Sequence, residues 1–488
     1  MYHALPSLIP DTSFGVFNNT VRVAGVALTE RYLNLKVGNV LTKPIQPEAA
    51  AFLIPSLDDF AAKLVKFTQR KARVYSHEEV VEMYTGPKRR VYEQALATYR
   101  REGVTREDSY LTTFIKFEKT NIDKAPRVIN PRKPVYNLCL ARYLKKLEKH
   151  IYRSIHKAFN SQSNHTVFKG MNIIESAADL RTKWDRFVDP VAVGGDITKL
   201  DMHISTAALK YEHSIYNRIF RNRKLKQLLK WQLHNKGHAV FKDGHITFSM
   251  EGTRSSGDIN TSLGNVIIVC ACIYELTRFG FDFEVVNNGD DFVLITESAN
   301  LHYITDNLPT MFKHKGFVLQ METPVYKFEE IEFCQTKPVF DGHTWRMVRL
   351  PQTVLKKDTI CLIPLQNDRI FQKWLRAVGD AGMSLCKGIP ILQSFYRLYQ
   401  RSGITYNDSF LRQVFKNTSY FTNVRDLAFL NHSITQEARL SFYYAFGVTP
   451  DRQVCIENYL DNVSIGLESE VLVGLIRDNN LIHNGIQL

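Results

Sequence analysis

The stretch Val285-Val286-Asn287-Asn288-Gly289-Asp290-Asp291-Phe292-Val293-Leu294-Ile295 joins two apolar runs through a short polar tip. This pattern predicts a strand, a turn and a second strand, which together form a β-hairpin. Gly289 allows the chain to turn tightly, and Asp290 and Asp291 bring two carboxylates together at the bend. Their mutual repulsion is costly unless a cation offsets it, so the tip predicts a divalent metal site. The tripeptide alone is more typical of a solvated hairpin turn than of a metal site.

The composition points to a large folded protein with a polyanionic partner. The 488 residues are 44% hydrophobic and 11% aromatic, which suits about two to four domains or one large enzyme with subdomains. Lys and Arg number 63 against 49 Asp and Glu, which gives a net charge of +14. This balance favours nucleic acid as the partner; an ordinary basic protein and a protein at a membrane surface are the alternatives.

The cysteines and the apolar segments predict a cytosolic protein without a membrane anchor of its own. The seven cysteines are scattered and lack zinc-ligand spacing, which predicts reduced thiols. The N-terminus has no signal-peptide pattern, and the most apolar segment, 266–274, is too short to cross a bilayer. We therefore expect another molecule to provide any attachment to a membrane.

The first third of the chain predicts an extended arm, helices and a basic ridge. Residues 1–60 are expected to lie on the body as an extended arm, and residues 58–101 show helical periodicity. A short strand at 114–117 precedes three prolines that keep the chain extended. Basic residues recur along this part, which predicts a positive ridge that could hold a triphosphate, with a charged surface loop as the alternative: Lys116, Lys119, Lys124, Arg127, Arg132 and Lys133.

The rest of the chain predicts alternating strands and helices, and then mainly helices. A strand ends at Asp196, and Asp201 begins the helix that follows it. The expected elements, in chain order, are a strand at 191–195, a helix at 203–221, a hairpin at 240–248, a helix at 259–278, two short strands within 314–339 and helices from about 350 onward.

Asp196 near Asp290 and Asp291 would make an oxygen-rich site suited to two Mg²⁺ ions. Two such ions roughly 4 Å apart can activate an attacking 3′-hydroxyl and stabilise the leaving oxygen of an in-line displacement. Phosphoryl transfer otherwise needs mainly positioning and charge neutralisation, and the basic ridge would supply the remaining positive charge.

These stretches, in their order and spacing, resemble the motifs of the viral RNA-dependent RNA polymerases, most closely those of the tombusvirus-like plus-strand group. Asp196-x4-Asp201 resembles motif A, SSGDINTSLGN at 255–265 resembles motif B, and Gly289-Asp290-Asp291 resembles motif C. KFEKTNIDKAPRVINPRKPVYN at 116–137 resembles motif F, and FCQTKP at 333–338 resembles motif E. With YTGPKRRVYEQA at 84–95, the resemblance covers about residues 84–340.

The resemblance implies an α+β fold of the right-hand type, with an antiparallel palm sheet flanked by helices and a mainly helical thumb. The expected parts are fingers with an N-terminal arm and fingertips at 1–190, a palm at 191–345 with a fingers insertion near 210–250, and a thumb at 346–488. It also implies RNA-templated RNA synthesis from ribonucleoside triphosphates with two Mg²⁺ or Mn²⁺ ions.

The resemblance further implies roles for individual residues. Asp196, Asp290 and Asp291 are the expected catalytic residues and, with Ile197, the expected metal ligands. The other expected groups are the nucleotide and ribose-selection residues Asp201, Ser256, Gly257, Thr261 and Asn265; the triphosphate- and template-binding residues Lys116, Lys119, Arg127 and Arg132; the primer-end hairpin residues Phe333, Cys334 and Gln335; and a general-acid lysine among Lys313, Lys315 and Lys327.

Two other functions fit parts of the pattern. A reverse transcriptase shares the metal site, but Asp201 and Asn265 favour a 2′-hydroxyl, and a non-catalytic RNA-binding protein would need only the positive charge. The expected partners are template and nascent RNA, ribonucleoside triphosphates and a separate membrane-anchoring viral replication protein, which would recruit the chain to membrane-associated replication complexes in the host cytoplasm. The sequence predicts no oligomeric state.

Overall fold

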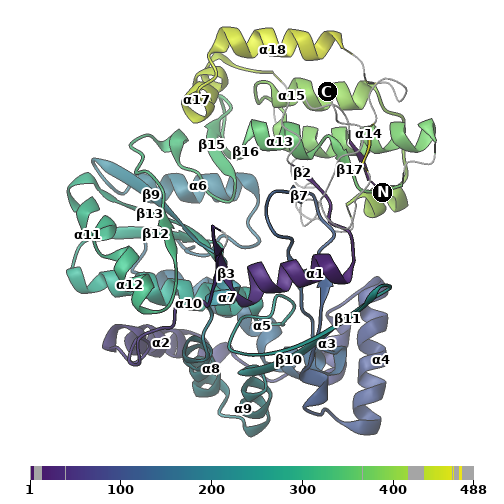
Figure 1. Ribbon diagram of the computed structural model, residues 1–488. Coiled ribbons are helices and arrows are strands. Elements are labelled where there is room, and N and C mark those ends of the chain that lie inside the picture. Colours follow the sequence, from purple (N-terminus) through teal and green to yellow (C-terminus); the bar gives the residue numbers. More distant parts are fainter. Residues whose placement is uncertain are drawn as a thin grey trace.

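A four-stranded antiparallel sheet lies at the centre of the computed structural model, which describes residues 2–4, 14–38, 40–364, 367–415, 433–463, 465 and 472–474. Figure 1 shows the sheet with helices packed around it. The fold therefore mixes helices and strands, as predicted. The strands lie in the order β12 (Phe283–Asn287), β13 (Asp291–Glu297), β9 (Pro190–Ile197) and β14 (Leu319–Met321).

Both faces of this sheet are covered because side chains alternate along each strand. Val193 and Ile197 of β9 point into the largest hydrophobic core, whereas Ala192 points into a smaller core on the other face. The larger core is built mainly by α2 (Pro55–Thr68), α5 (Pro134–Ala158), α8 (Thr206–Phe220), α10 (Thr261–Tyr274) and α12 (Leu308–His314). The smaller core is built by α6 (Ile173–Trp184), by the segment 325–333 and by Met347 of β16 (Trp345–Arg349), the strand that pairs with β15 (Thr336–Phe340).

Helix α10 is apolar on all sides because it runs through the larger core. With the 3₁₀ turn Glu275–Phe279 it forms the one helix, within the described residues, that is long and apolar enough to cross a membrane by length and composition. The segment that was predicted to be too short, 266–274, covers only part of this helix. The helix lies inside the fold, with 78% of its apolar window buried, as in the core helix of a globular domain.

The N-terminal region differs from the predicted extended arm. Thr20 caps α1 (Val21–Ala27), which continues into a π-helical turn at Leu28–Leu33. The region does lie on the body, since β2 (Phe14–Gly15) pairs with β7 (Thr120–Asn121). Its first strand, β1 (Tyr2–Ala4), pairs with β17 (Ile360–Cys361) and β18 (Leu472–Gly474), and a small hairpin joins β3 (Leu35–Val37) and β4 (Val40–Thr42).

The basic ridge begins, as predicted, with a strand. β6 (Phe114–Ile115) pairs with β8 (Val128–Ile129), so the intervening residues form a loop whose ends are joined. The predicted hairpin is longer than expected, with strands β10 (His234–Phe241) and β11 (Gly244–Glu251). Other helices and strands before the C-terminal region are α3 (His77–Glu82), α4 (Gly86–Glu102), β5 (Leu111–Thr112), α7 (Leu200–His203), α9 (Arg223–Lys230) and α11 (Leu301–Thr305).

The C-terminal region is mainly helical in its described residues, as predicted, and forms a separate core. Figure 1 shows its helices grouped together above the central sheet. The predicted break near 388–390 separates two of them. The helices are α13 (Pro351–Lys357), α14 (Asp368–Cys386), α15 (Leu392–Arg401), α16 (Asp408–Val414), α17 (Gln436–Phe446) and α18 (Pro450–Asn462).

Candidate active site

The tip of the hairpin between β12 and β13 is braced by a buried asparagine. Asn287 Nδ2 donates to the Gly289 carbonyl at 2.9 Å, and Asn287 Oδ1 accepts from the Gly289 N–H at 3.0 Å. Gly289 has a φ of +103°, which residues with a Cβ rarely adopt. Asp290 is consequently held exposed at the end of a well-defined turn.

Asp196 lies beside this tip, as the sequence predicted. The register of β13 on β9 places Asp291 directly opposite Asp196, and such cross-strand pairs have Cβ atoms about 5 Å apart. Burial, and then the charge of Asp290, raises the pKa of Asp196. Burial raises the pKa of Asp291 to about 6, and the charges of Asp290 and Asp196 act in the same direction. The three carboxylates therefore repel one another, and a cation would relieve that repulsion.

Asp291 is also tied to the turn at 333–336, which the sequence analysis assigned to the primer-end hairpin. The Cys334 N–H donates to Asp291 Oδ2 at 2.7 Å. Phe333 is buried in the smaller core, whereas Gln335 is exposed. The turn thus supports the acidic tip from behind, and only part of the predicted set is accessible to another molecule.

The carboxylates suit a Mg²⁺ or Mn²⁺ ion that takes further oxygen ligands from a substrate. Within the described residues, no group of three or more His, Cys, Asp or Glu side chains could hold a metal ion, so the predicted set of Asp196, Asp290 and Asp291 is not a complete site. Ile197 has a buried hydrocarbon side chain, so only its backbone carbonyl could be a ligand. Mg²⁺ is commonly held by one or two carboxylates plus waters and phosphate oxygens, and Asp196 with Asp290 fits that arrangement.

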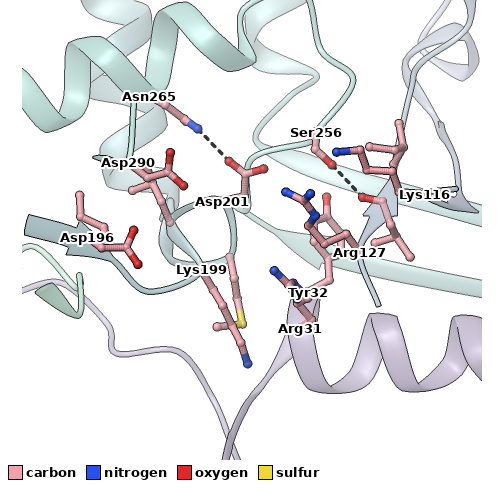
Figure 2. A pocket seen from close by; sticks show the side chains of 15 residues that line it. Arg31, Tyr32, Lys116, Arg127, Asp196, Lys199, Asp201, Ser256, Asn265 and Asp290 are labelled. Carbon is pink, nitrogen blue, oxygen red and sulfur yellow. Dashed lines mark hydrogen bonds between the residues drawn. The ribbon is translucent and has the colours of Figure 1, made fainter. Parts of the chain in front are cut away.

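A cavity of about 400 Å³ opens beside these carboxylates. Figure 2 shows carboxylates on one side of it and basic side chains opposite and below. The acidic side carries Asp196, Asp201 and Asp290; the basic residues are Arg31, Lys116, Arg127 and Lys199. The cavity can therefore hold a polyanion whose negative charge lies between bound cations and fixed basic side chains.

Two of the four predicted phosphate-binding residues line this cavity. Lys116 directly follows β6 and Arg127 directly precedes β8, and the two side chains share Glu118 as an ion-pair partner. The Lys116 Nζ lies 2.7 Å from Glu118 Oε2, and Arg127 binds both oxygens of the same carboxylate. The two basic side chains are thus partly exposed and held in place.

The other two predicted phosphate-binding residues lie elsewhere. Arg132 is 3% exposed and forms an ion pair with Asp258, with its Nε 2.5 Å from Oδ1. A guanidinium committed to a buried carboxylate cannot also bind a phosphate in the cavity, so this prediction does not fit the structure. Lys119 points toward the C-terminal region, where its Nζ donates to the Lys357 carbonyl at 2.7 Å.

The sequence analysis missed two basic residues of the cavity. Arg31 comes from the π-helical turn at 28–33 and donates from Nη1 to the Ala125 carbonyl at 2.8 Å. Lys199, which has a left-handed backbone, donates from Nζ to the Glu30 carbonyl at 2.7 Å. The π-helical turn therefore joins the basic ridge to the segment after Asp196. Such turns often occur at functional sites, but nothing in the local sequence around Arg31 signals its place.

Asp201 and Asn265, predicted to select ribose, form a pair at the back of the cavity. Asn265 Nδ2 donates to Asp201 Oδ1 at 2.9 Å, as drawn in Figure 2. Ser256 also lines the cavity, and its Oγ donates to the Val128 carbonyl at 3.0 Å. Burial raises the pKa of Asp201 to about 6, and the hydrogen bond from Asn265 opposes this shift.

The remaining members of the predicted ribose group have structural contacts. Thr261 Oγ1 donates to the carbonyls of Ser255 and Asp258 at 2.6 and 3.0 Å, so it fixes the start of α10 and does not face Asp201. A Cβ at Gly257 would lie 2.8 Å from backbone atoms of Pro131. Glycine at this position thus allows the loop before α10 to pack against the basic ridge.

The three candidate general-acid lysines lie outside the lining described for the cavity. Lys315 is buried and paired with Glu275, which does not fit a proton donor to a substrate. Lys327 lies over the Tyr444 ring, 5.1 Å from its centroid, and Lys313 is exposed on α12. The sequence analysis left the choice open, and the geometry removes Lys315 from it.

Asp201→Asn should gain stability relative to the wild-type chain as the pH rises from about 4 to about 6. Burial raises the pKa of Asp201 from about 4 in the unfolded chain to about 6 in the folded one. The stability that the protonated carboxyl contributes is complete below about pH 4 and is lost as the pH rises through about 6. Thermal unfolding of both proteins across this range measures the effect. A difference independent of pH would contradict it, and Asp306→Asn, at an exposed position, is the control.

Comparison with known proteins agrees with the family resemblance of the motifs over nearly the whole chain. The family described as "Viral RNA dependent RNA polymerase" matches residues 3–468. The RNA-directed RNA polymerase of Tobacco necrosis virus (strain A) is 40% identical over 463 residues, which cover 94% of this chain and 63% of that protein. The RNA-directed RNA polymerase of Carnation mottle virus is 37% identical over 93% of this chain and 59% of that protein. The one of Tomato bushy stunt virus (strain Cherry) is also 37% identical, over 94% of this chain and 55% of that protein.

The chain thus spans between 55% and 63% of the length of these three relatives. The match confirms the resemblance that motifs A, B, C, E and F indicated, and it extends beyond them to residues 3–468. On this basis the chain belongs to the family of viral RNA-dependent RNA polymerases.

Proposed function

We propose that this chain copies an RNA template into RNA from ribonucleoside triphosphates and so replicates a plus-strand RNA virus genome. The observation that carries the proposal is the cavity in which Asp196 and Asp290 face Lys116 and Arg127, with Asp201, bonded to Asn265, between the two groups. The relatives' names, each an RNA-directed RNA polymerase, support it.

The proposed mechanism divides the work among these residues. Asp196 and Asp290 would hold two Mg²⁺ or Mn²⁺ ions, with Asp291 supporting the tip through its bond to Cys334. When bound, such ions lower the pKa of the attacking 3′-hydroxyl and stabilise the leaving oxygen. Lys116 and Arg127 would neutralise the triphosphate and the departing pyrophosphate. Asp201 and Asn265 would read the 2′-hydroxyl, because a site built to bond a hydroxyl rejects the analogue lacking it.

We also propose that the parts of the fold correspond to a right-hand polymerase. The central sheet with its hairpin tip would be the palm, the region containing α3, α4, the basic ridge and the β10–β11 hairpin would be the fingers, and the helices from 346 onward would be the thumb. The separate core of the C-terminal helices supports the last assignment. Helix α6 packs on the sheet, so the proposed palm begins near residue 173 instead of 191.

Template-directed extension by the purified chain tests the proposal. The assay uses a single-stranded RNA template, ribo- or deoxyribonucleoside triphosphates, and Mg²⁺, Mn²⁺ or EDTA. We expect metal-dependent incorporation of ribonucleotides complementary to the template. Preferential use of deoxyribonucleotides would indicate a reverse transcriptase, and RNA binding without synthesis under every condition would indicate a non-catalytic binding protein.

We further propose, from the family resemblance, that a separate viral replication protein brings this chain to membranes in the host cytoplasm. The proposal can be tested by flotation of the chain with cytoplasmic membranes from cells that contain or lack the candidate protein. Equal flotation in both would contradict a requirement for that protein.

Arg127→Ala should raise the KM for ribonucleoside triphosphates about tenfold and leave the fold unchanged. Arg127 is half exposed and its pair with Glu118 lies at the cavity, so its loss removes a phosphate contact at little cost in stability. Steady-state extension kinetics and thermal unfolding measure the two effects. Arg100→Ala, which removes an exposed arginine paired with Glu78, should change neither. An unchanged KM in Arg127→Ala would contradict the triphosphate role.

A further inference from the structure

A fully buried arginine lies directly behind the proposed ribose-selection pair. Arg254, in the loop before α10, is 1% exposed, and its Nη2 pairs with Glu212 of α8, which is fully buried. Glu212 Oε1 in turn accepts hydrogen bonds from Tyr216 Oη and Asn260 Nδ2, both at 2.8 Å. These bonds fix the carboxylate, and the carboxylate fixes the guanidinium.

Helix α10 has a glycine where this ion pair crosses it. A Cβ at Gly264 would lie 2.3 Å from Arg254 Nη2 and 2.4 Å from Glu212 Oε1. Any side chain at this position would displace one of the two charged groups. The glycine directly before Asn265 therefore provides the space in which the buried pair reaches the asparagine.

Arg254 bonds to both members of the ribose-selection pair. Its backbone N–H donates to the Asp201 carbonyl at 2.8 Å, and its Nε donates to Asn265 Oδ1 at 3.1 Å. Asn265 then donates from Nδ2 to Asp201 Oδ1 at 2.9 Å (Figure 2). Arg254 thus holds both the backbone of Asp201 and the side chain of Asn265.

The chemistry of the guanidinium determines which way the amide faces. A guanidinium only donates hydrogen bonds, whereas an amide has a donor end and an acceptor end. Asn265 must therefore turn Oδ1 toward Arg254 and Nδ2 toward Asp201. The cavity then offers a hydroxyl an acceptor, the Asp201 carboxylate, next to a donor, the Asn265 amide. With the amide reversed, two acceptors would face each other, and the donor would be lost.

We propose that Arg254 is a positioning residue for sugar selection: held by Glu212, it sets the orientation of the Asn265 amide and thereby the ability of Asp201 and Asn265 to recognise a ribose 2′-hydroxyl. The proposal rests on the proposed polymerase function and deepens it. Arg254 touches no substrate in this arrangement, because it is buried behind Asp201 and Asn265, the two residues that would contact the ribose.

Arg254→Lys tests the proposal in extension reactions that compare each ribonucleotide with its deoxyribonucleotide. Lysine keeps the charge beside Glu212 but lacks the planar fork that bonds to Glu212 and Asn265 at once. We expect the ratio of kcat/KM for ribonucleotide over deoxyribonucleotide to fall about tenfold, as one oriented hydrogen bond is lost. The fall should come from the ribonucleotide, with kcat/KM for deoxyribonucleotide staying within about twofold. General damage to the fold would lower both values together.

A double-mutant cycle separates positioning from simple destabilisation. Asn265→Ala should lower the same ratio, and adding Arg254→Lys to it should have no further effect, because the orientation of an absent amide cannot matter. Arg346→Met is the matched control. Arg346 is also a fully buried arginine paired with a carboxylate, Asp341, so its loss should affect stability but not the ratio.

Each outcome supports or overturns the proposal. If Arg254→Lys does not fold, Glu212→Gln provides the same comparison, because glutamine keeps the shape of the side chain that pairs with Arg254 and removes its charge. The proposal would be overturned if either variant folds and keeps the wild-type ratio of kcat/KM for ribonucleotide over deoxyribonucleotide. It would also be overturned if Arg254→Lys and Asn265→Ala lowered this ratio independently. A wild-type chain that synthesises no RNA would instead count against the polymerase function itself, so the two failures are distinguishable.

Discussion

Asp290→Asn is expected to lower the rate of nucleotide addition on the order of a thousandfold or more, while RNA binding is retained. The substitution removes one of the three carboxylates that line the cavity and preserves the size of the side chain. The turn that carries it is built by Asn287 and Gly289, so the hairpin should keep its shape. Single-turnover extension measures the rate, and a filter-binding titration with the same RNA measures the affinity.

Asp306→Asn provides the control for this experiment, because it removes the same charge from an exposed helix end outside the cavity lining. It should behave like the wild-type chain. A rate for Asp290→Asn within about tenfold of wild type would contradict a role in holding catalytic ions. Loss of RNA binding in parallel with the rate would indicate a misfolded variant or a different role for this carboxylate.

Arg132→Ala is expected to reduce the free energy of unfolding by about 3–5 kcal/mol, because it leaves Asp258 as a buried, unpaired charge. The side chains of both partners are almost fully buried, at 1% and 3% exposed. Arg132 also donates to the Ser109 carbonyl and to Asn235 Oδ1, so these acceptors lose a partner as well. Denaturant unfolding, followed by fluorescence, measures the change.

The paired substitution Arg132→Met with Asp258→Leu should recover much of this loss, since removing both charges avoids the unpaired carboxylate. Arg127→Ala, only a few residues away along the same ridge, should leave stability nearly unchanged because its ion pair is exposed to solvent. If Arg132→Ala were as stable as the wild-type chain but had a raised KM for nucleotide, the original phosphate-binding prediction would be restored.

The elements with strong local patterns were predictable. The hairpin around Asp290 combines two apolar runs with a glycine turn, and α10 is a long apolar segment after a polar loop. The sequence placed a strand end at Asp196 and a helix start at Asp201, and the strand ends at Ile197 and the helix begins at Leu200, one residue away in each case. In these stretches hydrophobic periodicity and turn residues agree, so local sequence is enough.

The N-terminal region shows where local patterns failed. Residues 1–60 contain short apolar runs and prolines, which predicted an extended arm. The chain instead forms α1 and a π-helical turn that packs against the basic ridge and the segment after Asp196. A helix this short is marginal by itself, and its stability comes from contacts with residues about a hundred or more positions away along the chain.

The sequence by itself determined the strands and helices that have strong local patterns, the two acidic sites at 196 and 290, and the family to which the chain belongs. Only the tertiary structure decided that Arg127 faces the cavity while Arg132 is buried, that Arg31 also lines the cavity, and that Arg254 lies behind Asn265. The physical reason is that residue type and spacing specify local conformation. The exposure and charge partners of a basic side chain instead depend on segments far away in the sequence, such as those that bring Asp258 to Arg132 and Glu212 to Arg254.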